Sequence, residues 1–383
     1  MAKFKNSIEK GKYHIDKLIQ KPIKPKKQRT RKIYHKLEWK KPNGTILIEY
    51  KPQTTINDLN KTKYKPKKQK IKYPRNRKKY FEARQNHWND SIKLIHELIK
   101  MLNIKTYGSR RGRPPIPIKD KIFLCIQKVL RGVTYDSHAQ LIELAYYKNY
   151  TTTIPRPHSV ADFMNEIQLT PILERLVTMS ALPVAHFEKS FSIDSTGIST
   201  FDKSQWIKIR LDYKKHRDYK KLHAISGNRT NIIVAARVTH GTQADSPMLT
   251  PLLDIAKEKF NIKWFCADKA YSSRANTQAV TEAGAVPFLM PKKNFKTRSK
   301  GFPAWNKMIR MFRKQESYFR QFYHKRSNVE TSFAMIKRRI SNSVSSKNSV
   351  AQINEALCLV IAHNILVLIN SMYCDQLEIK FKN

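Results

Sequence analysis

The spacing of apolar residues changes twice along the chain, and it first predicts a run of helices. Residues 79–102 place apolar side chains at helical spacing, which predicts a helix used for packing or for a dimer contact. Four shorter helices are expected at residues 119–132, 137–147, 158–167 and 170–182, the last with Thr170 as its N-cap and Pro171 in the first position. Short helices on tight turns suit a helix-turn-helix-like DNA-binding region, and a plain helical bundle fits the same pattern equally.

Beyond residue 186 the pattern changes to short apolar runs alternating with helical segments, which indicates an α/β domain. Strands are expected at residues 191–194, 220–226 and 231–239, with a turn joining the last two. The pattern then predicts a helix at 246–260 with Ser246 as N-cap, a strand at 264–268, a helix at 273–283 and a short strand at 287–290. Two helices, at residues 317–340 and 350–373, complete it.

The helix expected at residues 317–340 carries a row of polar side chains beside its apolar stripe. At about 100° per residue, four polar residues fall within roughly 60° of one another: Tyr323, Arg326, Glu330 and Lys337. The apolar stripe, centred roughly 70° away, consists of Phe319, Phe322, Val329, Phe333, Ile336 and Ile340. The helix is therefore expected to bury one face and to present the polar row along the edge of that face.

Two aspartates change the interpretation of this row, because each ends a strand-like run. Asp194 ends the run at residues 191–194, and Asp268 ends the run at 264–268. Two strand-end aspartates and a helical glutamate are what a two-metal phosphoryl-transfer site requires, with hard carboxylate oxygens that suit Mg²⁺. The alternative is an ordinary amphipathic helix whose charged flank faces solvent.

The net charge points to a polyanionic partner. The 75 Lys and Arg residues against 29 Asp and Glu residues give a formal charge of +46, which favours nucleic acid over a merely solubilising surface. Residues 1–80 hold 27 basic and 5 acidic residues, and Pro/Lys clusters interrupt helices there. We expect a basic, largely disordered arm with one strand at residues 44–50, which contacts phosphates without sequence preference or serves as a targeting tail.

A short basic motif follows the arm, and the cysteines indicate the compartment. Arg111 and Arg113 flank a glycine in an Arg-Gly-Arg-Pro sequence like the AT-hook, whose arginines enter the minor groove; a basic linker is the alternative.

The four scattered cysteines suggest neither a zinc site nor disulfides and fit a reducing interior. The longest apolar run, residues 356–369, is too short to span a bilayer, so no membrane partner is expected.

Taken in order, these motifs resemble those of insertion-sequence DDE transposases in the group with a Tyr-Arg-Glu-Lys signature. The four helical residues stand at the family spacing, and both aspartates match, inside Asp194-Ser195-Thr196-Gly197 and Ala267-Asp268-Lys269-Ala270-Tyr271. The resemblance covers residues 114–372. It implies a ribonuclease-H-like mixed sheet in which the first and fourth strands lie side by side. The expected domains are the arm (1–80), a helical DNA-binding and dimerisation region (81–185), the catalytic domain (186–373) and a tail (374–383).

The resemblance also implies an activity. Asp194, Asp268 and Glu330 would be the catalytic and metal-binding residues, holding two Mg²⁺ or Mn²⁺ ions. Arg326 and Lys337 would touch transposon-end phosphates, and Tyr323 would pack near the terminal nucleotide. The implied partners are double-stranded DNA, as terminal inverted repeats and target, and a second copy of the chain, in the cytoplasm and nucleoid of a prokaryotic-type cell. A ribonuclease-H-like nuclease or resolvase, or a domesticated non-catalytic DNA-binding protein, remains the alternative to a transposase.

Overall fold

The computed structural model describes residues 34–40, 46–52, 76–104, 115–200, 219–295 and 299–381. These residues fall into two compact units, Met1–Tyr73 and Pro74–Asn383. In the first unit, β1 (Tyr34–Lys40) pairs antiparallel with β2 (Ile46–Pro52). The single strand expected in this region is therefore one half of a hairpin, because the polar run before it also pairs. The rest of the expected arm lies outside the described residues.

The second unit is built on a mixed sheet with the strand order β5-β4-β3-β6-β7, and β8 pairs with the far end of β3. The pairs β3–β4 and β4–β5 are antiparallel, whereas β3–β6 and β6–β7 are parallel. The expected adjacency of the first and fourth strands is thus confirmed, and the mixed sheet is consistent with a ribonuclease-H-like domain. The strands are β3 (Ser190–Thr200), β4 (Tyr219–Gly227), β5 (Ile233–His240), β6 (Trp264–Ala267), β7 (Val286–Leu289) and β8 (Ser343–Val344).

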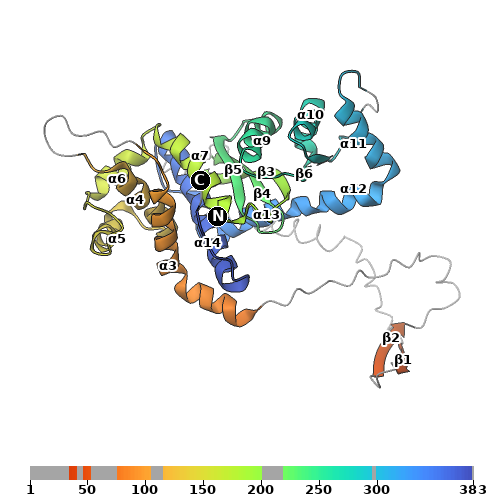
Figure 1. Ribbon diagram of the computed structural model, residues 1–383, viewed down its shortest axis with the longest axis horizontal. Helices are drawn as coiled ribbons and strands as arrows, with labels where there is room; N and C mark the ends of the chain where they lie inside the picture. The colour runs from red at the N-terminus through yellow and green to blue at the C-terminus, as the bar shows by residue number, and fades with distance from the viewer. Residues whose placement is uncertain are drawn as a thin grey trace, which may run out of the picture. The chain divides into compact units, whose positions relative to one another are not determined.

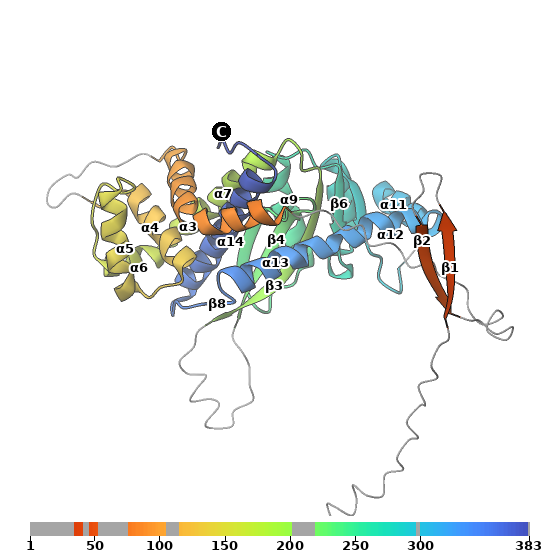
Figure 2. The same cartoon turned by 90° about the horizontal axis from the view of Figure 1, so that it is seen from below.

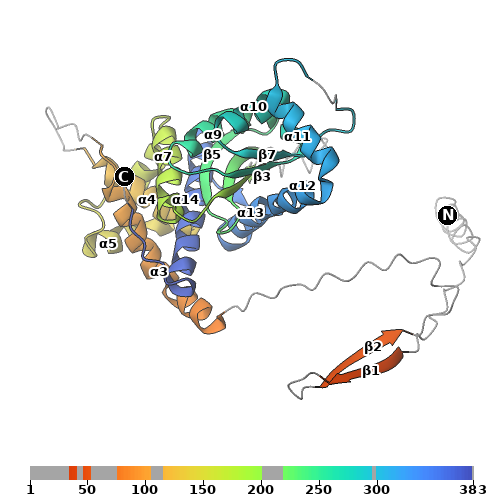
Figure 3. The same ribbon diagram turned by 45° about the vertical axis from the view of Figure 1, so that its right-hand side comes forward.

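Helices cover both faces of this sheet (Figure 1). On one face lie α9 (Leu249–Lys257) and α10 (Arg274–Glu282), and on the other lie α12 (Glu316–Tyr323) and α13 (Ser327–Arg339), as Figure 3 shows. A 3-10 turn of three residues separates α12 from α13, so the single helix expected at residues 317–340 has a short tightened segment. Its predicted apolar stripe faces inward, with four of its six members buried and two partly buried.

The last long helix, α14 (Ser349–Cys374), forms the centre of the second unit. It packs against β5 and against α3 (Arg77–Lys100), α4 (Ile118–Arg131) and α7 (Leu169–Ala181), which Figure 2 shows from below. By length and composition alone α14 could cross a membrane, but 78% of its apolar window is buried inside the protein. The apolar character of α14 is therefore that of a core helix.

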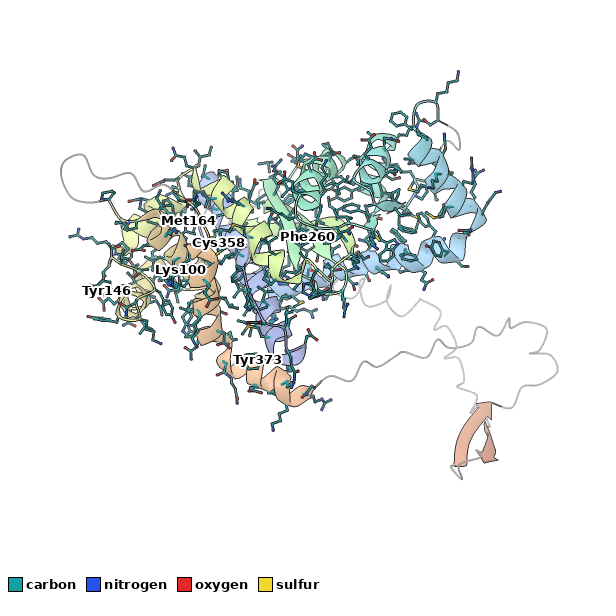
Figure 4. The ribbon with its side chains drawn as sticks, in the orientation of Figure 1. Lys100, Tyr146, Met164, Phe260, Cys358 and Tyr373 are labelled. Carbon is teal, nitrogen blue, oxygen red and sulfur yellow. The ribbon has the colours of Figure 1, made fainter. Side chains whose placement is uncertain are left out.

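Buried polar groups fix where α14 sits. The Asn364 side chain accepts a hydrogen bond from the Ile233 amide at 2.8 Å and donates to the Ile233 carbonyl at 2.7 Å. These bonds satisfy backbone groups of β5, which would otherwise be buried without partners. At the C-terminal end of the helix, the hydroxyl of Tyr373, labelled in Figure 4, donates to Asp90 on α3 at 2.8 Å. The helical region and the sheet are thus joined through α14.

Several expected helix starts are displaced. The helix α7 begins at Leu169, and the Thr170 hydroxyl donates to Asn354 on α14 at 2.7 Å instead of capping its own helix. Ser246 opens a 3-10 turn that leads into α9, and its N-cap is Asp245. The structure also contains α5 (Tyr135–Tyr147) and α6 (Pro157–Met164) close to their expected positions. It adds α11 (Pro303–Lys314), for which the pattern made no prediction.

Candidate active site

The site lies where β3 loses one of its two neighbours. The parallel pairing of β3 with β6 ends at Ile193 and Ala267, so the next residues, Asp194 and Asp268, follow side by side. The antiparallel pairing with β4 continues to Ser199. Asp194 therefore lies in the middle of β3, six residues before its end at Thr200, which corrects the expectation of a strand end. Asp268, in contrast, directly follows β6 as expected.

Three members of the polar row contact these aspartates or each other. The Tyr323 hydroxyl donates to Asp268 Oδ1 at 3.1 Å. The Arg326 guanidinium donates from Nη1 to Asp194 Oδ2 at 2.8 Å and from Nη2 to Glu330 Oε1 at 2.6 Å. The helix pair is thereby bonded to Asp268 at the end of β6 and to Asp194 on β3, and the pairing of β3 with β6 sets these two aspartates side by side. The five residues come from three separate segments of the chain, and the fold brings them together.

The local structure of the helices explains this geometry. Tyr323 ends α12, Arg326 ends the 3-10 turn and Glu330 lies in the first turn of α13. Residues four apart are neighbours on a helix surface, so Arg326 reaches Glu330 within its own segment and Asp194 across to the sheet. A carboxylate in the first turn is also favoured by the helix dipole. Arg326 therefore bridges the sheet and the helix.

Lys337, the last member of the polar row, contacts β3 two residues beyond Asp194. Its Nζ donates to the Thr196 hydroxyl at 2.7 Å. Side chains two apart on a strand share a face, so Thr196 and Asp194 point the same way. Burial lowers the pKa of Lys337. The lysine is therefore held, through a hydroxyl, against the strand that carries the aspartate.

The electrostatics of the network are those of a partly buried, mutually repelling set of acids with one cation among them. Burial raises the pKa of Asp194, and the charges of Asp268 and Glu330 raise it further, while the Ser195 amide and Arg326 oppose the shift. Burial acts to lower the pKa of Arg326, but Glu330 and Asp194 raise it above its ordinary value. Burial and Asp268 raise the pKa of Tyr323. The cation and the phenol therefore remain protonated.

The acids offer the right donor atoms for a hard divalent ion, but the guanidinium lies between two of them. Within the described ranges, no three acidic, histidine or cysteine side chains are grouped closely enough to hold a metal ion. One carboxylate oxygen of Asp194 and one of Glu330 are already paired with the Arg326 guanidinium. The donor chemistry fits Mg²⁺, which prefers carboxylates and retains waters. Arg326 therefore competes with such an ion for these two oxygens.

Comparison with known families bears on this cluster. Residues 185–365 match the family model described as a transposase DDE domain. The match supports a DDE transposase family for the chain, with the expected general functions of transposition and action on DNA. Such enzymes generally depend on divalent metal ions. The matched segment contains Asp194, Asp268, Glu330 and the rest of the polar row. No solved structure matched the chain.

Two further residues lie beside the acids, and the sequence analysis did not select either as a site residue. Tyr271, three residues after Asp268, is fully buried, and burial, followed by the charges of Asp245 and Asp194, raises its pKa. His223 lies opposite Ser195 in the pairing of β4 with β3, and its Nε2 forms a hydrogen bond with the Thr239 hydroxyl. Burial lowers the pKa of His223 to about 4. A lone histidine on a strand is more often structural, and Tyr271 has the character of an ordinary core residue, so neither was selected. The expected DNA contacts Arg111 and Arg113 lie outside the described residues.

Proposed function

We propose that the chain is a transposase that cleaves and joins DNA strands at the ends of its own mobile element, with Asp194, Asp268 and Glu330 as catalytic carboxylates. The observation that carries the proposal is the convergence of these acids: Tyr323 bonds to Asp268, Arg326 bonds to both Asp194 and Glu330, and strand pairing sets the two aspartates side by side. The family match covers the same segment. The Tyr-Arg-Glu-Lys subgroup follows from the spacing of the row and is part of the proposal.

The three carboxylates would hold the divalent ions, two Mg²⁺ or Mn²⁺. When bound, the ions would supply activation of the attacking oxygen and stabilisation of the leaving oxygen in an in-line displacement. Asp194 is fixed on the sheet by the Ser195 amide at 2.8 Å, so its carboxylate is already oriented. Glu330 is the more exposed partner, with 55% of its side chain accessible, and it can turn toward the aspartates once Arg326 leaves.

Arg326, Tyr323 and Lys337 would hold the DNA. A guanidinium forms two parallel hydrogen bonds to phosphate as readily as to carboxylate, because both present paired oxygens. The same Arg326 that bridges the acids in the free protein can therefore turn to a phosphate when DNA arrives. Lys337 would act as a point charge next to β3. Tyr323 would release Asp268 and pack beside the terminal nucleotide.

The remaining parts of the chain would supply DNA affinity and pairing. The short helices α4 to α7 are proposed to recognise the element ends, and the basic arm and the Arg111–Arg113 motif to contact phosphates and the minor groove. We further propose that two copies act together on two ends and that the protein works in a prokaryotic-type cytoplasm. Terminal repeats around the gene would distinguish this proposal from a host nuclease.

The test is the neutral, isosteric replacement of each acid. Asp194→Asn, Asp268→Asn and Glu330→Gln keep side-chain size and remove the charge that holds an ion. Each variant should lose Mg²⁺-dependent nicking of a labelled element end by orders of magnitude, while gel-shift binding and thermal melting stay near those of the unaltered protein. Glu316→Gln, an exposed acid paired with Arg320 on α12, is the matched control. Near-normal nicking by Asp194→Asn or Asp268→Asn would refute the proposed mechanism.

A further inference from the structure

The helix α11 presents a row of cations that has no partner in the described part of the chain. Between Glu282 and Glu316 the sequence contains nine Lys and Arg residues and no Asp or Glu. Three cations on α11, Lys307, Arg310 and Lys314, are exposed and form no ion pair or hydrogen bond with described residues. Some exposed cations elsewhere are paired, as Lys257 is with Asp254 at 2.7 Å. The α11 cations have no acid within their own stretch of sequence that could pair with them in this way.

The cations occupy one face of the helix. At about 100° per residue, Lys307, Arg310, Arg313 and Lys314 span roughly 120°, and neighbours three or four apart lie about 5–6 Å from each other. The opposite face is apolar and packed, with Trp305, Met308 and Ile309 buried along with Ala304. Like charges at this spacing repel one another and destabilise a helix. The row therefore costs stability unless an anion offsets the repulsion.

The scaffold under this face is rigid and leads to the acids. The Phe312 ring on α11 packs edge-on against Phe319 on α12, with centroids 5.2 Å apart, and Phe319 packs on Phe288 of β7 at 5.4 Å. Only Gln315 separates α11 from α12. The eight residues of α12 span about 12 Å, and at their far end Tyr323 contacts Asp268. Figures 1 and 3 show the two helices joined at this end of the sheet.

We infer that the cationic face of α11 binds the phosphate backbone of duplex DNA that is engaged at the acid site. This inference rests on the proposed function and extends it to a surface outside the polar row. Along one strand, phosphates follow each other every ~3.4 Å of helix axis, so a 12 Å offset corresponds to a few base pairs. Closely spaced, unpaired cations on a rigid support match such a repeating anion. A solvated face, or an acidic protein partner, is the outcome that the experiment must exclude.

The experiment measures how duplex binding depends on salt. In Lys307→Gln/Arg310→Gln/Lys314→Gln the slope of log K against log salt should fall by up to ~2.7, about 0.9 for each phosphate that the variant no longer neutralises. Arg313 is left in place because its guanidinium packs over Phe295, 5.5 Å from the ring centroid. The control is Lys257→Gln/Lys259→Gln/Lys380→Gln, which removes the same charge from three exposed positions. Lys257 ends α9, Lys259 follows that helix and Lys380 lies in the C-terminal segment, and this variant should leave the slope unchanged.

Binding is measured by fluorescence anisotropy without divalent ions, so cleavage does not enter the result. Lys307→Arg/Lys314→Arg keeps the charge and should bind like the unaltered protein, and unchanged melting shows that the variants fold. Equal slopes for the α11 variant and the unaltered chain would overturn this inference alone. A variant that loses binding to polyglutamate but not to duplex DNA would overturn it in favour of an acidic protein. Failure of the unaltered chain to bind any duplex would overturn both this inference and the proposed function.

Discussion

Replacement of Arg326 by alanine should tighten divalent-ion binding by the DNA-free protein about 30-fold. In the free protein the guanidinium is bonded to one oxygen of Asp194 and one of Glu330. An incoming ion must break both contacts before it can use those oxygens. Removal of the guanidinium eliminates this competition, so the ion should bind more tightly even though the variant lacks a residue proposed to bind DNA.

The size of the effect follows from burial. The Asp194 contact is largely shielded, with side-chain exposures of 22% and 18%, so a charge-assisted hydrogen bond there contributes about 1.5–3 kcal/mol. The Glu330 carboxylate is 55% exposed, and its ion pair contributes only about 0.5 kcal/mol. The lower sum is about 2 kcal/mol, and 1.4 kcal/mol corresponds to a tenfold change in affinity, which gives the ~30-fold expectation.

The assay is calorimetric titration of Mg²⁺ or Mn²⁺ into the free protein, with two comparison variants. Arg326→Lys retains the charge but has one ammonium group in place of the forked guanidinium. Its ion affinity should therefore lie between those of the unaltered protein and Arg326→Ala. Lys325→Ala removes the neighbouring charge, which lies over the Phe322 ring at 4.6 Å and contacts none of the acids. An unchanged or weaker affinity in Arg326→Ala, or an equal gain in Lys325→Ala, would refute the competition argument.

Two further predictions concern charge in other parts of the chain. Deletion of Met1–Tyr73, which carries 23 basic and 5 acidic residues, should reduce the salt slope of general DNA binding and leave end preference intact; an unchanged slope would contradict this. Stability should fall as pH drops from 6.5 toward 4, by up to ~4 kcal/mol per pH unit, because three buried histidines have pKa values lowered to about 4 and only the unfolded chain takes up their protons. These histidines are His138, His223 and His363. A melting temperature that stays constant between pH 6.5 and 4 would refute this prediction.

Local patterns predicted most of the secondary structure because each depends on residues close in sequence. The apolar stripe beginning at Phe319 and the helix start at Ser273, whose side chain accepts from the Asn276 amide, appear where they were expected. The helix α11 was missed, although Pro303 at its first position and the buried Trp305 and Met308 follow helical spacing. The surrounding glycine, proline and lysine residues of this region hid that signal. The length of β3 was underestimated because its second half is rich in small residues.

Side-chain partners could not be predicted in the same way, because they depend on the tertiary packing. The spacing of Arg326 and Glu330 indicated that they share a helix face, and the resemblance assigned Arg326 to DNA phosphate. Its contact with Asp194 depends on the packing that brings Arg326, at the end of the 3-10 turn, against β3. The same holds for Tyr323, expected near a nucleotide and found on Asp268.

These contacts couple the two proposed ligands of the site. Three carboxylates in a partly buried cluster repel one another, and the free protein offsets that repulsion with the charge of Arg326. A phosphate that draws Arg326 away leaves Asp194 and Glu330 with unneutralised charge, which favours a divalent ion. An ion that displaces Arg326 frees the guanidinium for phosphate. Because such coupling is reciprocal, DNA must raise ion affinity by the factor by which ions raise DNA affinity. In the proposed mechanism, Arg326 would thus link ion binding to the presence of DNA.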